Sequence, residues 1–160
     1  MAESVRSSDR TQRLYTEAER ARRDASVWTI VQGVLAPVQF LVFLISLALV
    51  IRFLVSGEGY TLATLSIVAK TAVLYTIMIT GAIWEKDVFG QWLFAPAFFW
   101  EDVVSFGVIA LHTLYIWMLW DGGFAPATEM TIALLAYLAY VVNAAQFLWK
   151  LRMARREVPA

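Results

Sequence analysis

The chain contains no cysteine and one histidine, His112, in its 160 residues. Without cysteine it can form no disulfide, no thiolate metal site and no covalent intermediate on a thiol. A single histidine excludes a zinc site built from several histidines and haem ligation by two histidines of one chain. These absences leave little room for redox or zinc chemistry carried by the chain itself.

Charge is also scarce, at 16% of residues, and it is unevenly placed. Most charged residues lie before residue 25, between residues 84 and 102, and after residue 149. The hydrophobic fraction is 60% and the mean hydropathy is +0.63, well above the roughly 45–50% apolar content of an ordinary globular domain. The polar opening has no apolar leader, so we expect no signal peptide and a soluble extension ahead of the first membrane segment.

Four apolar runs are long enough to cross a bilayer, which takes about 20 residues each. They cover residues 28–55, 62–84, 98–120 and 128–149. The sequence therefore predicts an all-α fold, an integral membrane four-helix bundle over residues 28–150. A cytoplasmic N-terminal amphipathic arm (1–27) precedes it and a cytoplasmic basic tail (151–160) follows it. Within the arm, Thr16 and Glu19 have capping-box spacing and predict a helix over about 17–24. Pro37 should kink the first span or mark its start.

Lys and Arg residues set the expected orientation. They are concentrated in the arm and the tail, whereas the first and third loops have only Arg52 between them. Because positive residues favour the cytoplasmic side, we expect both termini and the middle loop in the cytoplasm.

The segment from Trp84 to Asp102 is the most informative, because it places many aromatic residues between two acidic clusters. Carboxylates at the end of a membrane helix are costly unless they are paired, hydrated or used in function. The candidate catalytic residues are Glu101, Asp102, Glu85 and Asp87. Alternatively, Glu101 and Asp102 have no function beyond capping the third helix. Glu85 and Asp87 would then belong to an ordinary charge cluster at the membrane interface.

Helical periodicity groups the remaining polar residues. Glu101, Ser105, His112 and Tyr115 share one narrow face of the third span. His112 and Lys70 each lie roughly 21 Å from the cytoplasmic end of their spans, so they could be neighbours, and either could instead serve only the packing.

Nearer the cytoplasm, we expect Gln39, Asn143 and Gln146 to converge on the aromatic loop, where they are candidates for substrate binding. The simpler interpretation of these amides is hydrogen bonding between helices.

Two long segments, WEKDVFGQWLFAPAFFWEDVVS and DASVWTIVQGVLAPVQFLVFLISLALV, resemble the 3-vinyl (older name 2-vinyl) bacteriochlorophyllide hydratases of bacteriochlorophyll biosynthesis. The resemblance extends from about residue 14 to residue 156. It implies that water adds to the C3 vinyl group of chlorophyllide a or a 3-vinyl bacteriochlorophyllide, giving a 1-hydroxyethyl group. It also implies that no cofactor is needed, because the substrate carries its own magnesium. Nucleic acid is not an expected partner.

The implied chemistry assigns roles to the candidate residues. One carboxyl would protonate the vinyl group, and a second would stabilise the resulting cation and orient water. The ring plane would lie on aromatic side chains, namely Trp92, Phe98, Phe99 and Trp100. Lys70 or an arginine of the arm could pair with the substrate propionate. His112 could be an axial ligand to the substrate magnesium, although it lies roughly 16 Å from Glu101 along the helix.

Two other classes of protein remain open. A non-enzymatic pigment-binding or assembly protein would share the aromatic residues and would not need the carboxylates. A small transporter would use Lys70 or Glu101 as its coupling charge, but the chain has no evident internal duplication. A homo-oligomer or association with other pigment-pathway enzymes is compatible with either pigment hypothesis.

Overall fold

The computed structural model describes residues 13–157, and within that range it contains helices and no strand. The helices are α2 (Glu17–Ala25), α3 (Val27–Ser56), α4 (Tyr60–Phe89), α5 (Phe99–Asp121) and α6 (Pro126–Arg156). The last four are long and apolar enough to cross a membrane. The all-α, four-span prediction is therefore confirmed. The outer parts of the predicted arm and tail, residues 1–12 and 158–160, lie outside the described residues.

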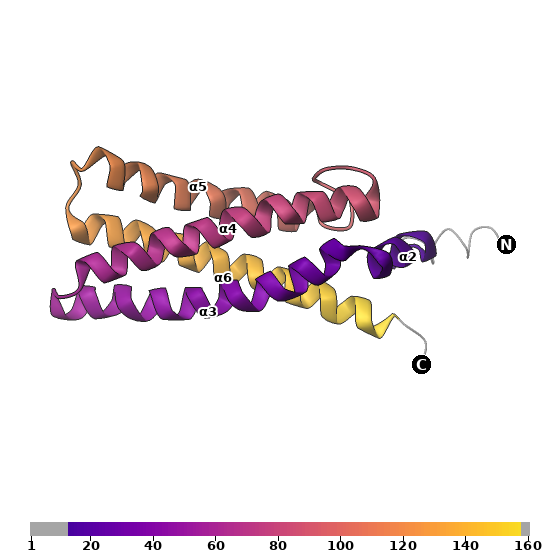
Figure 1. Ribbon diagram of the computed structural model, residues 1–160, viewed down its shortest axis with the longest axis horizontal. Coiled ribbons are helices and arrows are strands. Elements are labelled where there is room, and N and C mark those ends of the chain that lie inside the picture. Colours follow the sequence, from indigo (N-terminus) through magenta and orange to yellow (C-terminus); the bar gives the residue numbers. More distant parts are fainter. Residues whose placement is uncertain (1–12, 158–160) are drawn as a thin grey trace.

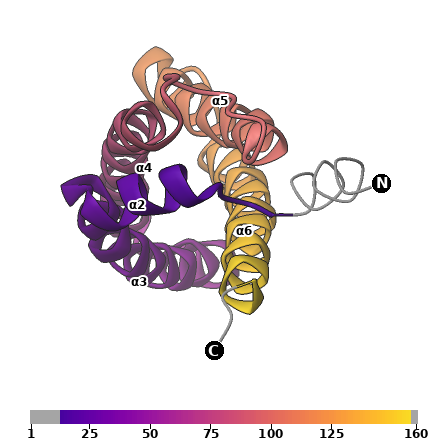
Figure 2. The same cartoon turned by 90° about the vertical axis from the view of Figure 1, so that its right-hand side faces the viewer.

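The four long helices form two antiparallel hairpins (Figure 1). Helix α3 packs extensively on α4, and α5 on α6, whereas α3 with α6 and α4 with α5 have far fewer contacts. Viewed from one end, the four helices form a ring, and α2 lies across that end (Figure 2). The hairpins are thus internally well packed and more loosely joined to each other.

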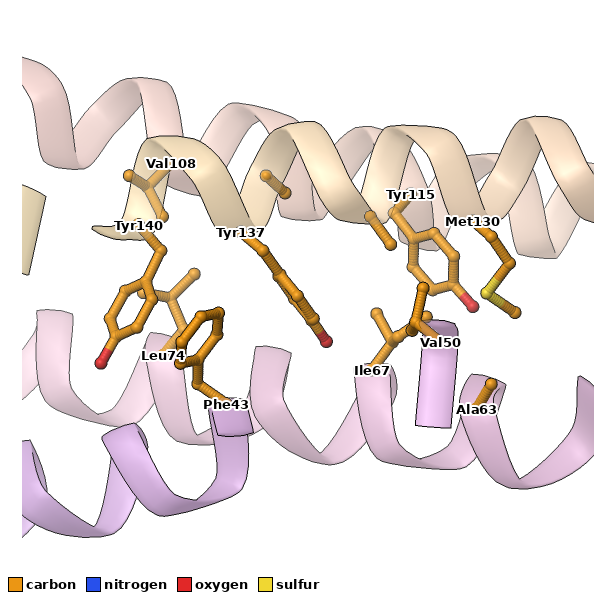
Figure 3. Packing of buried hydrophobic residues seen from close by; sticks show 12 residues of the cluster. Phe43, Val50, Ala63, Ile67, Leu74, Val108, Tyr115, Met130, Tyr137 and Tyr140 are labelled. Atoms are coloured by element: carbon orange, nitrogen blue, oxygen red, sulfur yellow. The ribbon is translucent and has the colours of Figure 1, made fainter. Parts of the chain in front are cut away.

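Aromatic and aliphatic side chains fill the interior of the ring. Tyr115, Tyr137 and Tyr140 point inward from α5 and α6 toward Phe43 of α3 and Ile67 of α4 (Figure 3). Many large apolar residues on the outside are exposed, including Ile30, Val55 and Leu148. Apolar residues on both faces are expected when one face packs on the bundle and the other meets lipid.

Several helices extend beyond the apolar runs from which they were predicted. Helix α4 passes Trp84 and ends at Gly90, whose φ of 81° is the left-handed conformation that glycine adopts easily. Helix α6 continues to Arg156, through residues expected in the tail. Hydropathy indicates expected membrane depth, and charged residues with good helix propensity extend the helices past it. Helix α3 starts at Val27 and runs through Pro37, so Pro37 does not mark its start.

Helix α2 is fixed to the end of the bundle where α4 stops. The predicted capping box is present, with Thr16 and Glu19 bonded to each other's backbone N–H groups. The Arg22 side chain donates to the Val88 carbonyl at 2.7 Å. Tyr15 is 2% exposed and stacks on Phe89, and burial raises the pKa of Tyr15 to about 12.

Both ends of the described chain meet at this end of the bundle. The Leu14 backbone N–H donates to the Glu157 carboxylate at 3.0 Å. This bond joins the segment ahead of α2 directly to the end of α6. The connection between α4 and α5 lies at the same end (Figure 1). This end, which holds α2, residues 90–98 and the end of α6, is called the loop end below.

Candidate active site

Two carboxyl groups from neighbouring helices meet at the loop end. Glu85 lies in the last turns of α4 and Asp102 in the first turn of α5, and each is only 4% exposed. Their side chains are close enough to pair with each other. Two carboxyl groups can share a hydrogen bond only when one of them is protonated, so a pair of this kind can hold a proton for donation.

The connection between α4 and α5 folds over the carboxyl pair. The Phe94 N–H donates to the Asp102 carboxylate at 2.7 Å, and the Ala95 N–H donates to Glu85 at 3.3 Å. Phe94 has a φ of 59°, which is uncommon for a residue with a bulky side chain. Strained backbone of this kind persists where the surroundings hold it, and here the two carboxyl groups do so.

Glu101 lies beside the pair and has a different set of partners. It is 4% exposed, and its carboxylate oxygen Oε2 is 3.3 Å from the Lys150 ammonium group of α6. Lys150 also donates to the Ala97 carbonyl, so it ties the connecting segment to α6. The Glu101 main-chain carbonyl accepts hydrogen bonds from Asn143 at 2.9 Å and Ser105 at 2.8 Å.

The face predicted from periodicity does point inward. Glu101, Ser105, His112 and Tyr115 are each at most 4% exposed. Asp102 lies to the side of this face. Glu85 of α4 packs against that side, so Asp102 is buried as well.

Asp87 lies apart from the carboxyl pair. Its side chain is on the exposed side of α4 and accepts a hydrogen bond from the Ser26 hydroxyl at the start of α3. Ser26 also accepts from the Trp28 N–H and caps α3. Asp87 therefore joins the end of α4 to the start of α3, apart from the Glu85–Asp102 pair.

The predicted aromatic residues occupy two environments. Phe98 is 2% exposed and packs among Tyr15, Trp84 and Phe147. The other three are largely exposed around the carboxyl pair, at 59% for Trp92, 43% for Phe99 and 68% for Trp100. Only these three could offer a flat face to a ligand without rearrangement.

Lys70 and His112 are neighbours, as their depth predicted. Lys70 Nζ lies 3.1 Å from His112 Nε2, and both residues are fully buried. Because His112 Nδ1 bonds to the Val108 carbonyl, which can only accept, Nε2 is the acceptor for Lys70. The Lys70 ammonium group also lies 4.0 Å from the centre of the Tyr140 ring. Neither side chain is accessible to a propionate or a magnesium ion in this arrangement.

The predicted amide residues also differ in their partners. Asn143 bonds to Glu101 and Ser105. Gln146 has a side-chain oxygen, Oε1, that is buried without a hydrogen-bond donor. Gln39 is buried on α3. Within residues 13–157, no group of three or more histidine, aspartate or glutamate side chains could hold a metal ion.

Sequence reasoning missed two residues of this site. One is Lys150, whose spacing from Asn143 and Gln146 places all three on one face of α6. The role of the Phe94 backbone left no signal in the sequence, because nothing about the residue type predicts a positive φ.

Four apolar helices with two buried, paired carboxyl groups at one end are the features of a small multi-pass membrane protein. Comparison with known proteins gives the family. A sequence profile of the 2-vinyl bacteriochlorophyllide hydratase family matches residues 15–153, and the chain belongs to that family.

Two curated relatives bear that same name. The protein from Cereibacter sphaeroides is 68% identical over 148 residues, covering 92% of each chain. The protein from Rhodobacter capsulatus is 69% identical over 142 residues, covering 89% of this chain and 82% of its own. No solved structure matches the chain significantly.

Proposed function

We propose that the chain is a hydratase that adds water to the C3 vinyl group of chlorophyllide a or a related 3-vinyl bacteriochlorophyllide in bacteriochlorophyll biosynthesis. Family membership supports the reaction. The single structural observation that carries the chemistry is the buried pair of carboxyl groups, Glu85 and Asp102, held under the backbone of residues 94 and 95. It supplies one proton, and the reaction needs one proton at its first step.

The carboxyl pair acts as the general acid. Its shared proton passes to the terminal carbon of the vinyl group, which becomes a methyl group. The positive charge then lies on the inner carbon, where conjugation with the macrocycle spreads it. Once the pair has lost its proton it is anionic, and its negative charge stabilises the cation. Glu85 and Asp102 together thus protonate the vinyl group and stabilise the cation, two roles that the sequence analysis assigns to separate carboxyl groups.

Glu101 acts on the water. It is next to Asp102 in sequence, and the Lys150 ammonium group is its partner, whereas Glu85 and Asp102 have each other. A carboxylate so placed orients water toward the inner carbon and accepts a proton as the carbon–oxygen bond forms. The product gains one water overall, and solvent returns the proton from Glu101 to the pair.

Access to the pair requires the connecting segment to move. Glu85 and Asp102 are covered by the backbone of Phe94 and Ala95. When the segment moves away, the exposed rings of Trp92, Phe99 and Trp100 are placed to receive the flat face of the pigment. Closure over the bound ring would then exclude bulk water from the cation.

The mechanism uses no group beyond the chain, the pigment and water. We propose accordingly that the protein needs no cofactor, and that the magnesium belongs to the substrate. A role for His112 as its axial ligand would require the bond to Lys70 to break.

The loop end faces the cytoplasm in this proposal. Both ends of the described chain meet there. Among the Lys and Arg residues that the structure describes, Arg52 lies at the other end and Lys70 in the middle of the bundle, and the rest are at the loop end. The membrane would be the inner or intracytoplasmic photosynthetic membrane. Association with a second copy or with neighbouring pathway enzymes would allow direct transfer of a poorly soluble pigment.

The first test is to incubate membranes containing the chain with chlorophyllide a and to analyse the pigments by liquid chromatography and mass spectrometry. The expected product is heavier by one water and has the absorption shift that follows loss of the conjugated vinyl group. Pigment that co-purifies unchanged would contradict the hydratase function and favour a binding or assembly protein. Membranes without the chain are the control.

A further inference from the structure

Helix α6 presents three polar side chains to the first turn of α5. Asn143, Gln146 and Lys150 follow one another at spacings of three and four residues, so they lie on one face of the helix. Asn143 bonds to the Glu101 carbonyl, and Lys150 lies against the Glu101 carboxylate. Gln146 lies between these two residues on the same face of α6, so helix geometry directs its side chain toward the same part of α5.

Two buried acceptor oxygens in this region have no hydrogen-bond donor. One is Gln146 Oε1 and the other is Glu101 Oε2, and both atoms are fully buried. Lys150 Nζ approaches Glu101 Oε2 to 3.3 Å as an ion pair, but the alignment is not that of a hydrogen bond. Buried acceptors without donors are uncommon in folded proteins and call for an explanation.

A water molecule is the ligand that fits two such acceptors, because it has two O–H groups to donate. A metal ion fits poorly, since the Lys150 ammonium group already lies beside Glu101 and one carboxylate with one amide is a weak ligand set. The rest of the neighbourhood is satisfied, with Ser105 and Asn143 bonded to each other at 3.1 Å.

We propose that Glu101 and Gln146 bind the water molecule that attacks the pigment. This inference rests on the proposed hydratase function and assigns its second substrate a site. Gln146 accepts one O–H and holds the oxygen lone pair toward the cation, while Glu101 accepts the other and takes its proton as the bond forms. Gln146 is thus a positioning residue for the nucleophile, distinct from the carboxyl pair that supplies the first proton.

The two-step reaction allows a test that separates water capture from protonation. In D₂O the carboxyl pair delivers a deuteron to the vinyl carbon. The cation can then be captured by water, or it can lose a proton and return as vinyl pigment carrying deuterium. The ratio of deuterium in the recovered vinyl pigment to hydrated product measures how often capture fails, and it does not depend on the amount of folded protein.

The variant to test is Gln146→Met, which keeps the side-chain length and removes the acceptor. We expect kcat to fall by about tenfold to a hundredfold with little change in KM, since a hydrogen bond to the nucleophile is lost. The ratio of exchange to hydration should rise. The matched control is Gln32→Met, because Gln32 bonds to Thr80 of α4 at 2.7 Å and makes no contact with Glu101.

Three results have distinct meanings. A raised ratio in Gln146→Met and an unchanged ratio in Gln32→Met would support the water site. An unchanged ratio in Gln146→Met would overturn it, even if total activity fell, because a structural defect lowers both rates together. If the unaltered chain hydrates no pigment, the proposed function itself fails, and the water site with it.

Discussion

The loop end and the middle of the bundle both bury ionisable side chains, but they satisfy them differently. In the middle, Lys70 and His112 bond to each other, and His112 also bonds to the Val108 carbonyl. At the loop end, Glu85 and Asp102 are paired with each other, and Glu101 retains an acceptor oxygen without a hydrogen-bond donor. A closed set of partners holds helices together, whereas an open set leaves capacity for a substrate.

The largest expected effect concerns the carboxyl pair at the loop end, the proposed general acid. Asp102→Asn and Glu85→Gln each remove the shared proton, so hydration should fall by about 10²–10⁴-fold, the usual contribution of a general acid. Pigment binding should persist in both. The assay is the rate of product formation by mass spectrometry, normalised to folded protein.

Asp121→Asn is the matched control, since Asp121 is exposed at the far end of α5. Asp87→Asn addresses the competing candidate. A loss of hydration in Asp87→Asn combined with full activity in Asp102→Asn would assign the acid role to Asp87. The carboxyl pair at the loop end would then not be the general acid.

The second prediction concerns the residue that acts on water. Glu101→Gln should lower hydration by about 10²-fold, the lower end of the range for acid–base groups, because the amide can still accept a hydrogen bond from water but cannot take its proton. The protein should remain folded and pigment-bound. Steady-state kinetics measure the effect, with Glu58→Gln in the exposed first loop as control. Full activity of Glu101→Gln would remove Glu101 from the mechanism.

The third prediction concerns the closed set in the middle. Lys70→Met leaves His112 Nε2 buried without a donor and should reduce the free energy of unfolding by about 1–3 kcal/mol. Adding His112→Phe removes the second partner and should recover part of that loss, since apolar replacement of both partners is often nearly neutral. Unfolding in detergent, followed by circular dichroism, gives the measurement.

Lys70→Met also tests whether Lys70 pairs with the substrate propionate. If Lys70 binds the substrate propionate, Lys70→Met should raise KM for chlorophyllide beyond what the loss of stability explains. A structural role predicts that KM per folded molecule stays constant. The two outcomes decide whether the middle of the bundle belongs to the substrate site.

Much of the fold was accessible from the sequence because hydropathy and helical period act over many residues. Four apolar runs give four helices, and equal depth brings Lys70 to His112. The pairing of Glu85 with Asp102 was not accessible, because it depends on how residues 90–98 turn back between α4 and α5. That turn requires a positive φ at Phe94, a conformation no sequence pattern predicts for phenylalanine.

The site was therefore found as a set of residues and not as a geometry. Periodicity places Glu101 on the inner face of α5, but it cannot say that Lys150 reaches it from α6. Asp87 looks equivalent to Glu85 in a list of acidic residues. Helix geometry separates them by about 200° around α4, and the structure gives Asp87 to Ser26 instead.

The tryptophans around the loop end have a consequence for how the pigment travels. Trp92, Trp100 and Trp149 are exposed beside the carboxyl groups, and tryptophan settles at the boundary between lipid and water. In the proposed reaction, the apolar pigment would arrive along the membrane and water would arrive from the aqueous side. The new hydroxyl group would make the product more polar than its precursor. The product would then form at the boundary that solvates it best, and partitioning would favour its release.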